Sequence, residues 1–194
     1  MSVRLDELMT RRRLGGAALI LGGLVVAALV LWPALHGDEP TQARAAPVRL
    51  VTVPQFGLAF AHPRSWSRRI NGRVIRLRSP DGTAILTFSS FPGREPKRVK
   101  AALTGALKTR FSPATVVRDG PGLLGARRVD SVELSGFDRS GRVRALAMVE
   151  DTPHRTYTIT LLTPPHPSRE RLLEVSRILA TVRFTKPESL ASKQ

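Results

Sequence analysis

The sequence contains one literal G-x-G-x-x-G, the segment Gly120-Pro121-Gly122-Leu123-Leu124-Gly125. This motif binds a pyrophosphate only when a strand precedes it and a helix begins inside it, because backbone N–H groups and the helix dipole must converge on the anion. Here Pro121 removes one N–H, and the following residues, Ala126 to Leu134, are typical of a strand. We therefore interpret the segment as a glycine-rich loop between strands and not as a dinucleotide site.

Other constellations for catalysis or metal binding are weak. The four histidines, His36, His62, His154 and His166, show no H-x-x-x-H spacing, and the chain has no cysteine. Thiolate catalysis, iron–sulfur clusters and cysteine-ligated zinc are thereby excluded. There is no G-x-S-x-G elbow and no S-x-x-K pair for serine hydrolysis. We predict no catalytic residue, no metal and no cofactor.

Paired carboxylates are also scarce. Asp130 with Glu133, and Glu150 with Asp151, lie in strand or turn contexts among many arginines. General acid–base work needs two such groups facing each other in a cleft. We expect these acids to form structural ion pairs.

The strongest chemical feature is positive charge, with 31 Lys plus Arg against 15 Asp plus Glu and a formal net charge of +16. A field of this sign attracts polyanions but does not identify one. Basic residues cluster on a predicted helix and on a predicted strand. The candidate anion-contacting residues are Arg73, Arg76, Arg78, Arg94, Lys97, Arg98, Lys100 and Lys108. Candidate partners are an acidic envelope protein, an anionic lipid or an acidic polymer, and a solvated basic face is the alternative explanation.

One hydrophobic segment near the N-terminus is predicted to cross a membrane. From Leu14 to Leu35 the sequence reads LGGAALILGGLVVAALVLWPAL, without one charge. At about 1.5 Å per residue this helix would span about 33 Å, and a bilayer core is about 30 Å thick. Arg11, Arg12 and Arg13 precede the span, whereas acidic residues follow it. The positive-inside rule places residues 1–13 in the cytoplasm and the C-terminal part outside.

A cleaved signal peptide is the alternative, because Ala43-Arg44-Ala45 resembles an A-x-A cleavage site. Cleavage near Ala45 would give a secreted protein. The apolar run is longer than the about 7–15 residues usual for signal peptides, and the site lies well beyond it. A retained anchor is therefore favoured, followed by a tether at residues 36–47.

Residues 48–187 have the length of one domain. Period-two patterns predict strands at 48–53, 57–61, 73–78 and 83–88, with tight turns at Asn71-Gly72 and at Ser79 to Gly82. Further strands are predicted at 115–119, 127–134, 143–150 and 155–163. Mostly hairpin links favour an antiparallel sheet of about six to eight strands in an α+β domain.

Two amphipathic helices are predicted. In the first, Glu95 to Phe111, the apolar face includes Val99, Ala102, Leu103 and Ala106. In the second, Ser168 is the N-cap, and the apolar stripe is formed by Leu172, Leu173, Val175, Ile178, Leu179 and Val182. Residues 188–194 are polar and are expected to form a frayed tail.

Three segments together resemble the Mog1/PsbP-like domains of bacterial envelope proteins. They are FGLAFAHPRSW (Phe56 to Trp66), RLRSPDGTAILTFSS (Arg76 to Ser90) and the pair RTYTITLLTPP with RLLEVSRILATVRF (Arg155 to Pro165 and Arg171 to Phe184). The resemblance covers residues 48–184. It implies an antiparallel sheet flanked by helices and a binding or assembly role without chemistry. No ligand residues are carried over by it.

The sequence thus predicts a single-pass membrane protein whose extracytoplasmic domain is a non-enzymatic binding or accessory module. The bilayer would raise the concentration of the domain near partners at the membrane. A small envelope hydrolase with an unrecognised site is the alternative from another class. Nucleic-acid binding is not favoured, since stacking needs exposed aromatic residues, and aromatic residues of all kinds make up only 5% of the chain.

Overall fold

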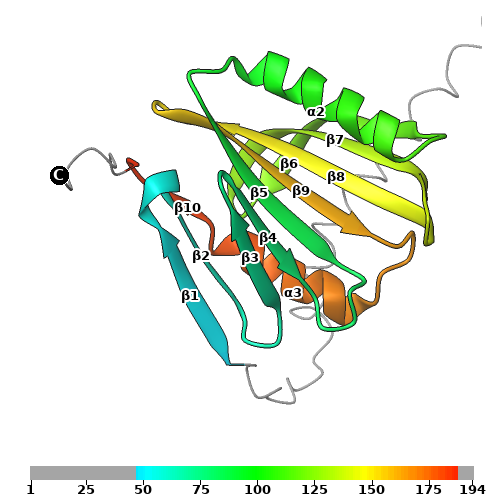
Figure 1. The fold of residues 1–194 in the computed structure, drawn as a ribbon, viewed down its shortest axis with the longest axis horizontal. Coiled ribbons are helices and arrows are strands. Elements are labelled where there is room, and N and C mark those ends of the chain that lie inside the picture. Colours follow the sequence, from blue (N-terminus) through cyan, green and yellow to red (C-terminus); the bar gives the residue numbers. More distant parts are fainter. Residues whose placement is uncertain (1–46, 188–194) are drawn as a thin grey trace, which may run out of the picture. The chain divides into compact units, whose positions relative to one another are not determined.

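The computed structural model describes residues 47–187. These residues form two α-helices and ten strands in two antiparallel sheets (Figure 1). The predicted membrane segment Leu14 to Leu35, the tether up to Ala46 and the tail from Glu188 lie outside the described residues. Over residues 47–187, no helix has the length and apolar character needed to cross a bilayer.

The larger sheet has seven strands, and each pairs antiparallel with its neighbours. In sheet order they are β3 (Ser67–Asn71), β4 (Val74–Arg78), β5 (Ile85–Pro92), β9 (Arg155–Thr163), β8 (Gly141–Asp151), β7 (Arg127–Asp138) and β6 (Thr115–Leu124). The smaller sheet has three strands, β1 (Val48–Val53), β2 (Leu58–Pro63) and β10 (Arg183–Phe184), with a 3₁₀ turn η1 (Pro54–Phe56) after β1.

The α+β class is confirmed, and the seven strands of the larger sheet fall within the predicted six to eight, but the separate three-stranded sheet was not predicted. Strands β3 and β10 were not predicted. Every residue of β3 is exposed, so the strand carries no buried-and-exposed alternation, and β10 has only two residues. Strand β6 is longer than predicted because it continues through Gly120-Pro121-Gly122 to Leu124.

The turn between β4 and β5 forms as its sequence predicts. The hydroxyl of Ser79 donates to Asp81 Oδ1 at 2.6 Å, and the N–H of Gly82 donates to the carbonyl of Ser79 at 2.9 Å. Gly82 has a φ of +72°, a value that favours glycine. The hydrogen bond from Ser79, with those from Thr83 and Arg171, holds the pKa of Asp81 far below its usual range.

Helix α2 (Pro96–Arg110) covers one face of the larger sheet. Its Leu107 and the following Phe111 form a small core with side chains of β7 and β8, which are Val132, Leu134, Ala145 and Ala147. Gly136 on β7 permits this contact, because a Cβ there would lie 2.4 Å from the carbonyl oxygen of Phe111. The helix is therefore placed over β7, β8 and β9.

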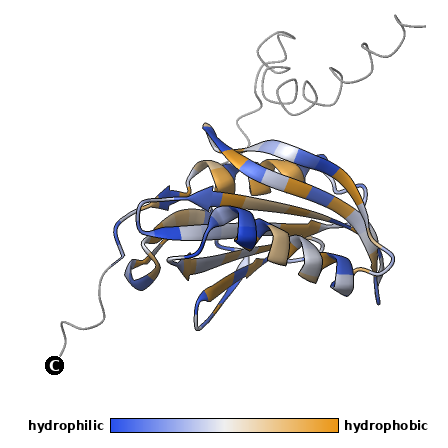
Figure 2. Cartoon of the chain, turned by 90° about the horizontal axis from the view of Figure 1, so that it is seen from above, coloured by the Kyte–Doolittle hydropathy of each residue, from blue (hydrophilic) through white to orange (hydrophobic). Residues whose placement is uncertain are grey.

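Helix α3 (Arg169–Ala180) and the smaller sheet cover the opposite face, where the main core lies. The N–H of Arg171 donates to the Ser168 hydroxyl at 3.2 Å, which confirms the predicted N-cap. Val175 and Ile178 are buried as expected. Leu172 and Leu173, which were also expected in the buried stripe, are 37% and 42% exposed, because the helical turn of about 100° per residue directs them away from the side of Val175 and Ile178. The alternation of apolar and polar residues along the strands is visible in Figure 2.

Candidate anion-binding surface

The larger sheet extends beyond helix α2. The helix packs on β7, β8 and β9, whereas β3, β4 and β5 continue the same sheet to its other edge. On the α2 side these three strands carry mostly polar and basic residues, because their apolar partners point into the main core on the other side. The uncovered part of this face, together with the flank of α2, forms the candidate site.

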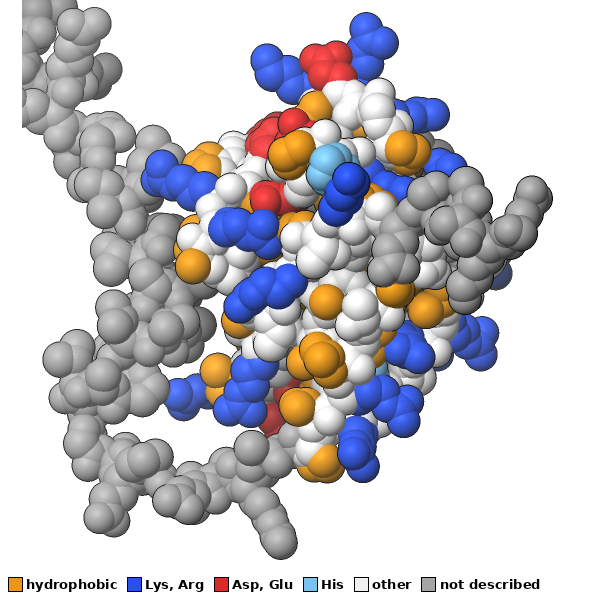
Figure 3. Space-filling view, turned by 90° about the vertical axis from the view of Figure 1, so that its left-hand side faces the viewer, with side chains coloured by type: hydrophobic (Ala, Val, Ile, Leu, Met, Phe, Trp, Pro, Cys, Tyr) orange, Lys and Arg blue, Asp and Glu red, His pale blue; other side chains and the backbone are white. Residues whose placement is uncertain are grey.

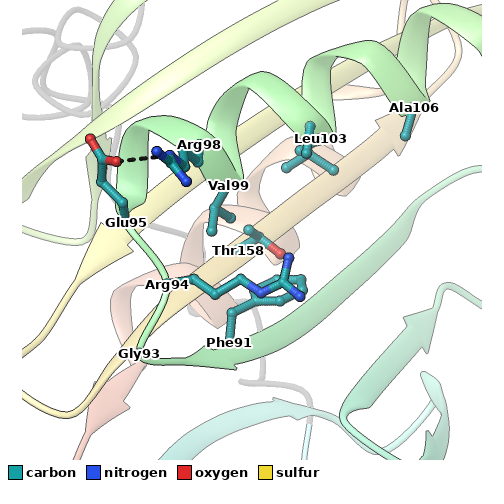
Figure 4. A pocket seen from close by; sticks show the side chains of 10 residues that line it. Phe91, Gly93, Arg94, Glu95, Arg98, Val99, Leu103, Ala106 and Thr158 are labelled. Carbon is teal, nitrogen blue, oxygen red and sulfur yellow. Dashed lines mark ion pairs between the residues drawn. The ribbon is translucent and has the colours of Figure 1, made fainter.

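A groove of about 590 Å³ runs along the flank of α2 (Figure 4). Phe91 of β5 and Thr158 of β9 lie below it. Val99, Ala102, Leu103 and Ala106 follow one side of the helix along it, and Arg94, Glu95 and Arg98 lie at its end. Ala102 and Ala106 were predicted to be part of the core face of the helix. Both are exposed, because α2 packs mainly on β7 and β8 and these two side chains line the open groove over β9 and β5.

A second hollow, of about 420 Å³, adjoins the groove, since Phe91 and Arg94 line both. Its other lining residues include Arg73 and Val74 at the start of β4 and Ser89 on β5. The carbonyl of Arg94 accepts a hydrogen bond of 2.7 Å from the Thr156 hydroxyl, which fixes the Arg94 backbone to β9. Arg73 and Arg94 thus lie on either side of one hollow beside the apolar groove.

The strand register adds further arginines to this face. Arg69 of β3 lies opposite Arg76 of β4, which lies opposite Thr87 of β5. Arg78 of β4 is two residues from Arg76 and therefore points to the same side. Arg69 was not among the predicted residues. The predicted turn did not reveal it, because the two loop residues are Gly72 and Arg73, whereas a loop of Asn71 and Gly72 would have placed Arg69 opposite Val74.

The basic residues of this face differ in whether an acidic side chain pairs with them. In residues 47–187, Arg98 pairs with Glu95 at 3.2 Å on the surface, where such a pair contributes little. Five other arginines of this face form no ion pair with an acidic residue of the same range. They are Arg69, Arg73, Arg76, Arg78 and Arg94. These guanidinium groups are exposed and open to an external anion.

Lys100 has a different environment. It was expected to project away from the core, but its side chain is only 17% exposed and lies between Asp119 at 2.5 Å and Asp130 at 2.6 Å. Burial alone would lower the pKa of Lys100, but the two carboxylates raise it above its usual value overall. Lys100 therefore joins α2 to β6 and β7. Lys97 and Lys108 are exposed on α2 and do not line the groove.

Two of the acidic residues that were considered as paired carboxylates form ion pairs with arginines. Glu133 pairs with Arg118 and Arg144, and Glu150 pairs with Arg127 at 3.2 Å, as expected of structural ion pairs. Burial raises the pKa of Glu150, and Arg127 opposes the shift.

The G-x-G-x-x-G segment lies in β6 and in the turn after it, and strand β7 follows. The interpretation as a loop between strands was therefore wrong, because most of the segment is itself strand. The strand continues because the Gly120 carbonyl accepts a hydrogen bond from Ser131 on β7 and the ladder runs to Leu124.

The histidines do not converge. His62 is buried, and its Nδ1 lies 2.8 Å from the Pro63 carbonyl, while His154 and His166 lie in separate loops. Over residues 47–187, no cluster of three or more His, Asp or Glu side chains is arranged to hold a metal ion. His36 lies outside the described residues.

The arrangement can therefore bind an anion. Guanidinium groups stay protonated at any physiological pH, and their planar donor pattern fits carboxylate and phosphate oxygens. The apolar lining of the groove adds a surface for a non-polar group beside the anion. Figure 3 shows Lys and Arg side chains spread over one face of the domain, with fewer acidic side chains among them.

Comparison with known proteins reveals similarity at the level of fold. No protein-family model matches the chain, and no curated protein sequence matches it. The cyanobacterial PsbP (CyanoP) of Synechocystis sp. PCC 6803 superposes with a TM-score of 0.52 at 11% identity, over 76% of this chain and 98% of that one. The chain thus has a PsbP-like fold, as its resemblance to the Mog1/PsbP-like domains implied.

Two other solved structures are more distant. A protein of Bacteroides thetaiotaomicron VPI-5482 has a TM-score of 0.49 at 13% identity over 75% of this chain, which spans only 50% of that one. LpqN of Mycobacterium tuberculosis, involved in cell envelope biogenesis, has a TM-score of 0.47 at 13% identity over 72% of this chain and 91% of its own.

Proposed function

We propose that this protein is a membrane-anchored, extracytoplasmic accessory or assembly module without catalytic activity, and that it contacts anionic partners through the groove beside α2. Three arginines line the proposed contact, Arg73, Arg94 and Arg98, and Arg69, Arg76 and Arg78 extend it across the sheet. Lys100 is left out because two carboxylates already engage it. Lys97 and Lys108 contribute to the long-range field of α2.

The observation that carries the proposal is the grouping of these arginines around an apolar groove. An arginine without an acidic neighbour gains little by lying beside others of the same charge. A cluster of this kind becomes favourable when an anion binds, because each charge-assisted hydrogen bond contributes about 1.5–3 kcal/mol. The sign of the cluster also favours a fast encounter with an anionic partner.

The membrane location rests on the uncharged segment Leu14 to Leu35 and the arginines before it. With such an anchor the domain would search only the membrane surface, which raises its effective concentration for partners there. The tether would limit the distance over which it acts to a few nanometres.

The location is tested with the full-length chain. We expect it to stay in the membrane fraction after an alkaline wash. Protease added outside intact cells should remove the C-terminal domain. Recovery of the chain in the cytosolic fraction would refute the anchor and the placement together.

The contact is tested by crosslinking in the same cells, with a photo-reactive amino acid at Ala102 in the groove. Changing Arg73, Arg94 and Arg98 together to Glu should lower the yield of crosslinked product at least about tenfold, since 1.4 kcal/mol corresponds to about tenfold. The matched control changes three exposed arginines elsewhere to Glu, namely Arg139, Arg169 and Arg177. Equal losses in both variants would mean that net charge alone governs the contact, and the proposed surface would be wrong.

A further inference from the structure

We propose that the groove beside α2 binds an acyl chain of an anionic lipid, whose head group is held by Arg73, Arg94 and Arg98. This inference rests on the proposed function, because it names the chemistry of the anionic partner. It adds a requirement that the proposed function does not have, which is that a hydrocarbon chain must enter the groove.

The lining of the groove is predominantly apolar along its length. Val99, Ala102, Leu103 and Ala106 of α2 form one wall, and the Phe91 ring lies below them (Figure 4). The volume of about 590 Å³ falls in the range of about 300–1,000 Å³ usual for small-molecule sites. A groove of this lining removes apolar surface from water when a hydrocarbon occupies it.

The backbone around the groove favours hydrocarbon over peptide. Strand β5 pairs with β4 on one side and with β9 on the other, and β9 pairs in turn with β8. Beyond its first turn, the backbone of α2 is bonded within the helix. Beside the groove, the β4-facing edge of β5 lacks a strand partner only from Ser90 to Pro92, so a peptide could pair over three residues at most. Each other N–H or C=O that it buried unpaired would cost free energy. An acyl chain carries no such groups.

The cations enter the groove from one end. Arg94 and Arg98 belong to the end where α2 begins, the Arg94 side chain extends from there toward Phe91 (Figure 4), and Arg73 faces Arg94 across the adjoining hollow. Glu95 is the single acid lining either space, and it pairs with Arg98. A phosphodiester head would meet guanidinium donors there, whereas the added ammonium of a zwitterionic head would meet the same cations unfavourably. The geometry therefore selects an anionic head with a hydrocarbon tail.

The experiment exploits the absence of cysteine from the chain. A fluorophore is attached to the full-length protein at Ala106→Cys in the groove or, as the control site, at Arg139→Cys in the turn between β7 and β8. The protein is placed in phosphatidylcholine nanodiscs that contain a minor fraction of phosphatidylglycerol with a nitroxide on its acyl chain. We expect several-fold stronger quenching at Ala106 than at Arg139, and much weaker quenching when the nitroxide chain belongs to phosphatidylcholine.

Two alanine variants test entry of the chain directly. Ala102→Trp fills the groove, whereas Ala101→Trp places the same ring on an exposed position one residue away. Quenching at Ala106 should disappear with Ala102→Trp and persist with Ala101→Trp. Quenching that is equal at the two labelled sites, equal for both head groups, or unaffected by Ala102→Trp would overturn the inference.

Failure of the lipid inference can be distinguished from failure of the proposed function. Partner crosslinking that depends on the three arginines but survives Ala102→Trp, with the crosslinker then at Ala106, would indicate a protein or polymer on the arginine surface. In that case the proposed function would stand and the lipid inference would fall. Selective quenching without any arginine-dependent partner crosslinking would support the lipid as the anionic ligand itself.

Discussion

Removing the carboxylate of Glu174 should destabilise the domain markedly, because this group joins α3 to Trp66 and also pairs with Arg171, which itself reaches Asp81. Its Oε2 accepts a hydrogen bond of 3.0 Å from Trp66 Nε1 and pairs with Arg171. Arg171 also pairs with Asp81 at 3.0 Å, and its guanidinium lies 5.7 Å from the Trp66 ring centroid. The side chains of Arg171 and Glu174 are only 14% and 18% exposed, so solvent replaces these contacts poorly.

The magnitude follows from what Glu174→Ala leaves behind. The indole N–H of buried Trp66 loses its acceptor, which costs about 1–3 kcal/mol. Arg171 keeps Asp81 but loses its other carboxylate, which adds about 1 kcal/mol for a pair that is not fully buried. The sum is about 3 kcal/mol, or about 6–12 °C in Tm for a domain of this size. Glu174→Gln retains an acceptor for Trp66 and should cost about 1 kcal/mol.

The assay is denaturant unfolding followed by Trp66 fluorescence in a Trp32→Phe background. Glu170→Ala provides the control, since Glu170 lies exposed in the first turn of the same helix. Its loss affects only the helix dipole, a contribution of about 0.3–1 kcal/mol. If the two alanine variants shift the midpoint equally, the network around Glu174 does not stabilise the fold and the reasoning is refuted.

Three other predictions concern stability. Burial, with two nearby arginines, lowers the pKa of His62 below 6.5 despite a backbone hydrogen bond. The unfolded chain therefore binds this proton first, so the unfolding free energy should fall as pH drops through about 6.5. A stability–pH profile of His62→Gln that keeps the same slope would contradict this. Lys100→Met leaves two carboxylates facing each other and should cost about 1 kcal/mol at low salt, less at high salt; a urea midpoint that ignores salt would argue against it. Gly136→Ala brings a Cβ to 2.4 Å from the Phe111 carbonyl and should cost at least about 1–3 kcal/mol. Gly105→Ala, with open space around its Cβ, should instead stabilise α2 by up to about 1 kcal/mol, and thermal melts of both variants test the pair.

Local pattern was sufficient for most of the fold. The turn at Ser79 to Gly82 was readable because serine, aspartate and glycine each have a specific role within four residues. The Ser168 cap and the period of α2 could also be predicted, because both depend on residues only a few positions apart. Strand β3 was not readable, since an edge strand with every residue exposed has no alternation to detect. Strand β10 is held by pairing with distant β2, and two residues carry no period.

The candidate site was predicted only in part. Sequence spacing grouped the basic residues of α2 with those of β4, and Arg73, Arg94 and Arg98 do line adjoining hollows. Spacing could not exclude Lys100, because its carboxylates lie on β6 and β7, nineteen and thirty residues away. It could not include Arg69, whose placement depends on the register of β3 against β4.

The sequence by itself determined the α+β class, the positive charge, the exclusion of cysteine chemistry, most turns and both helices of residues 47–187, because each follows from neighbours within a few residues. Only the tertiary structure decided that β1, β2 and β10 form a separate sheet and that α2 leaves part of the larger sheet uncovered. It also decided which cations are paired. The physical reason is that these outcomes depend on contacts between segments distant in the chain, where the width of a sheet and the position of a carboxylate are set by packing and not by local spacing.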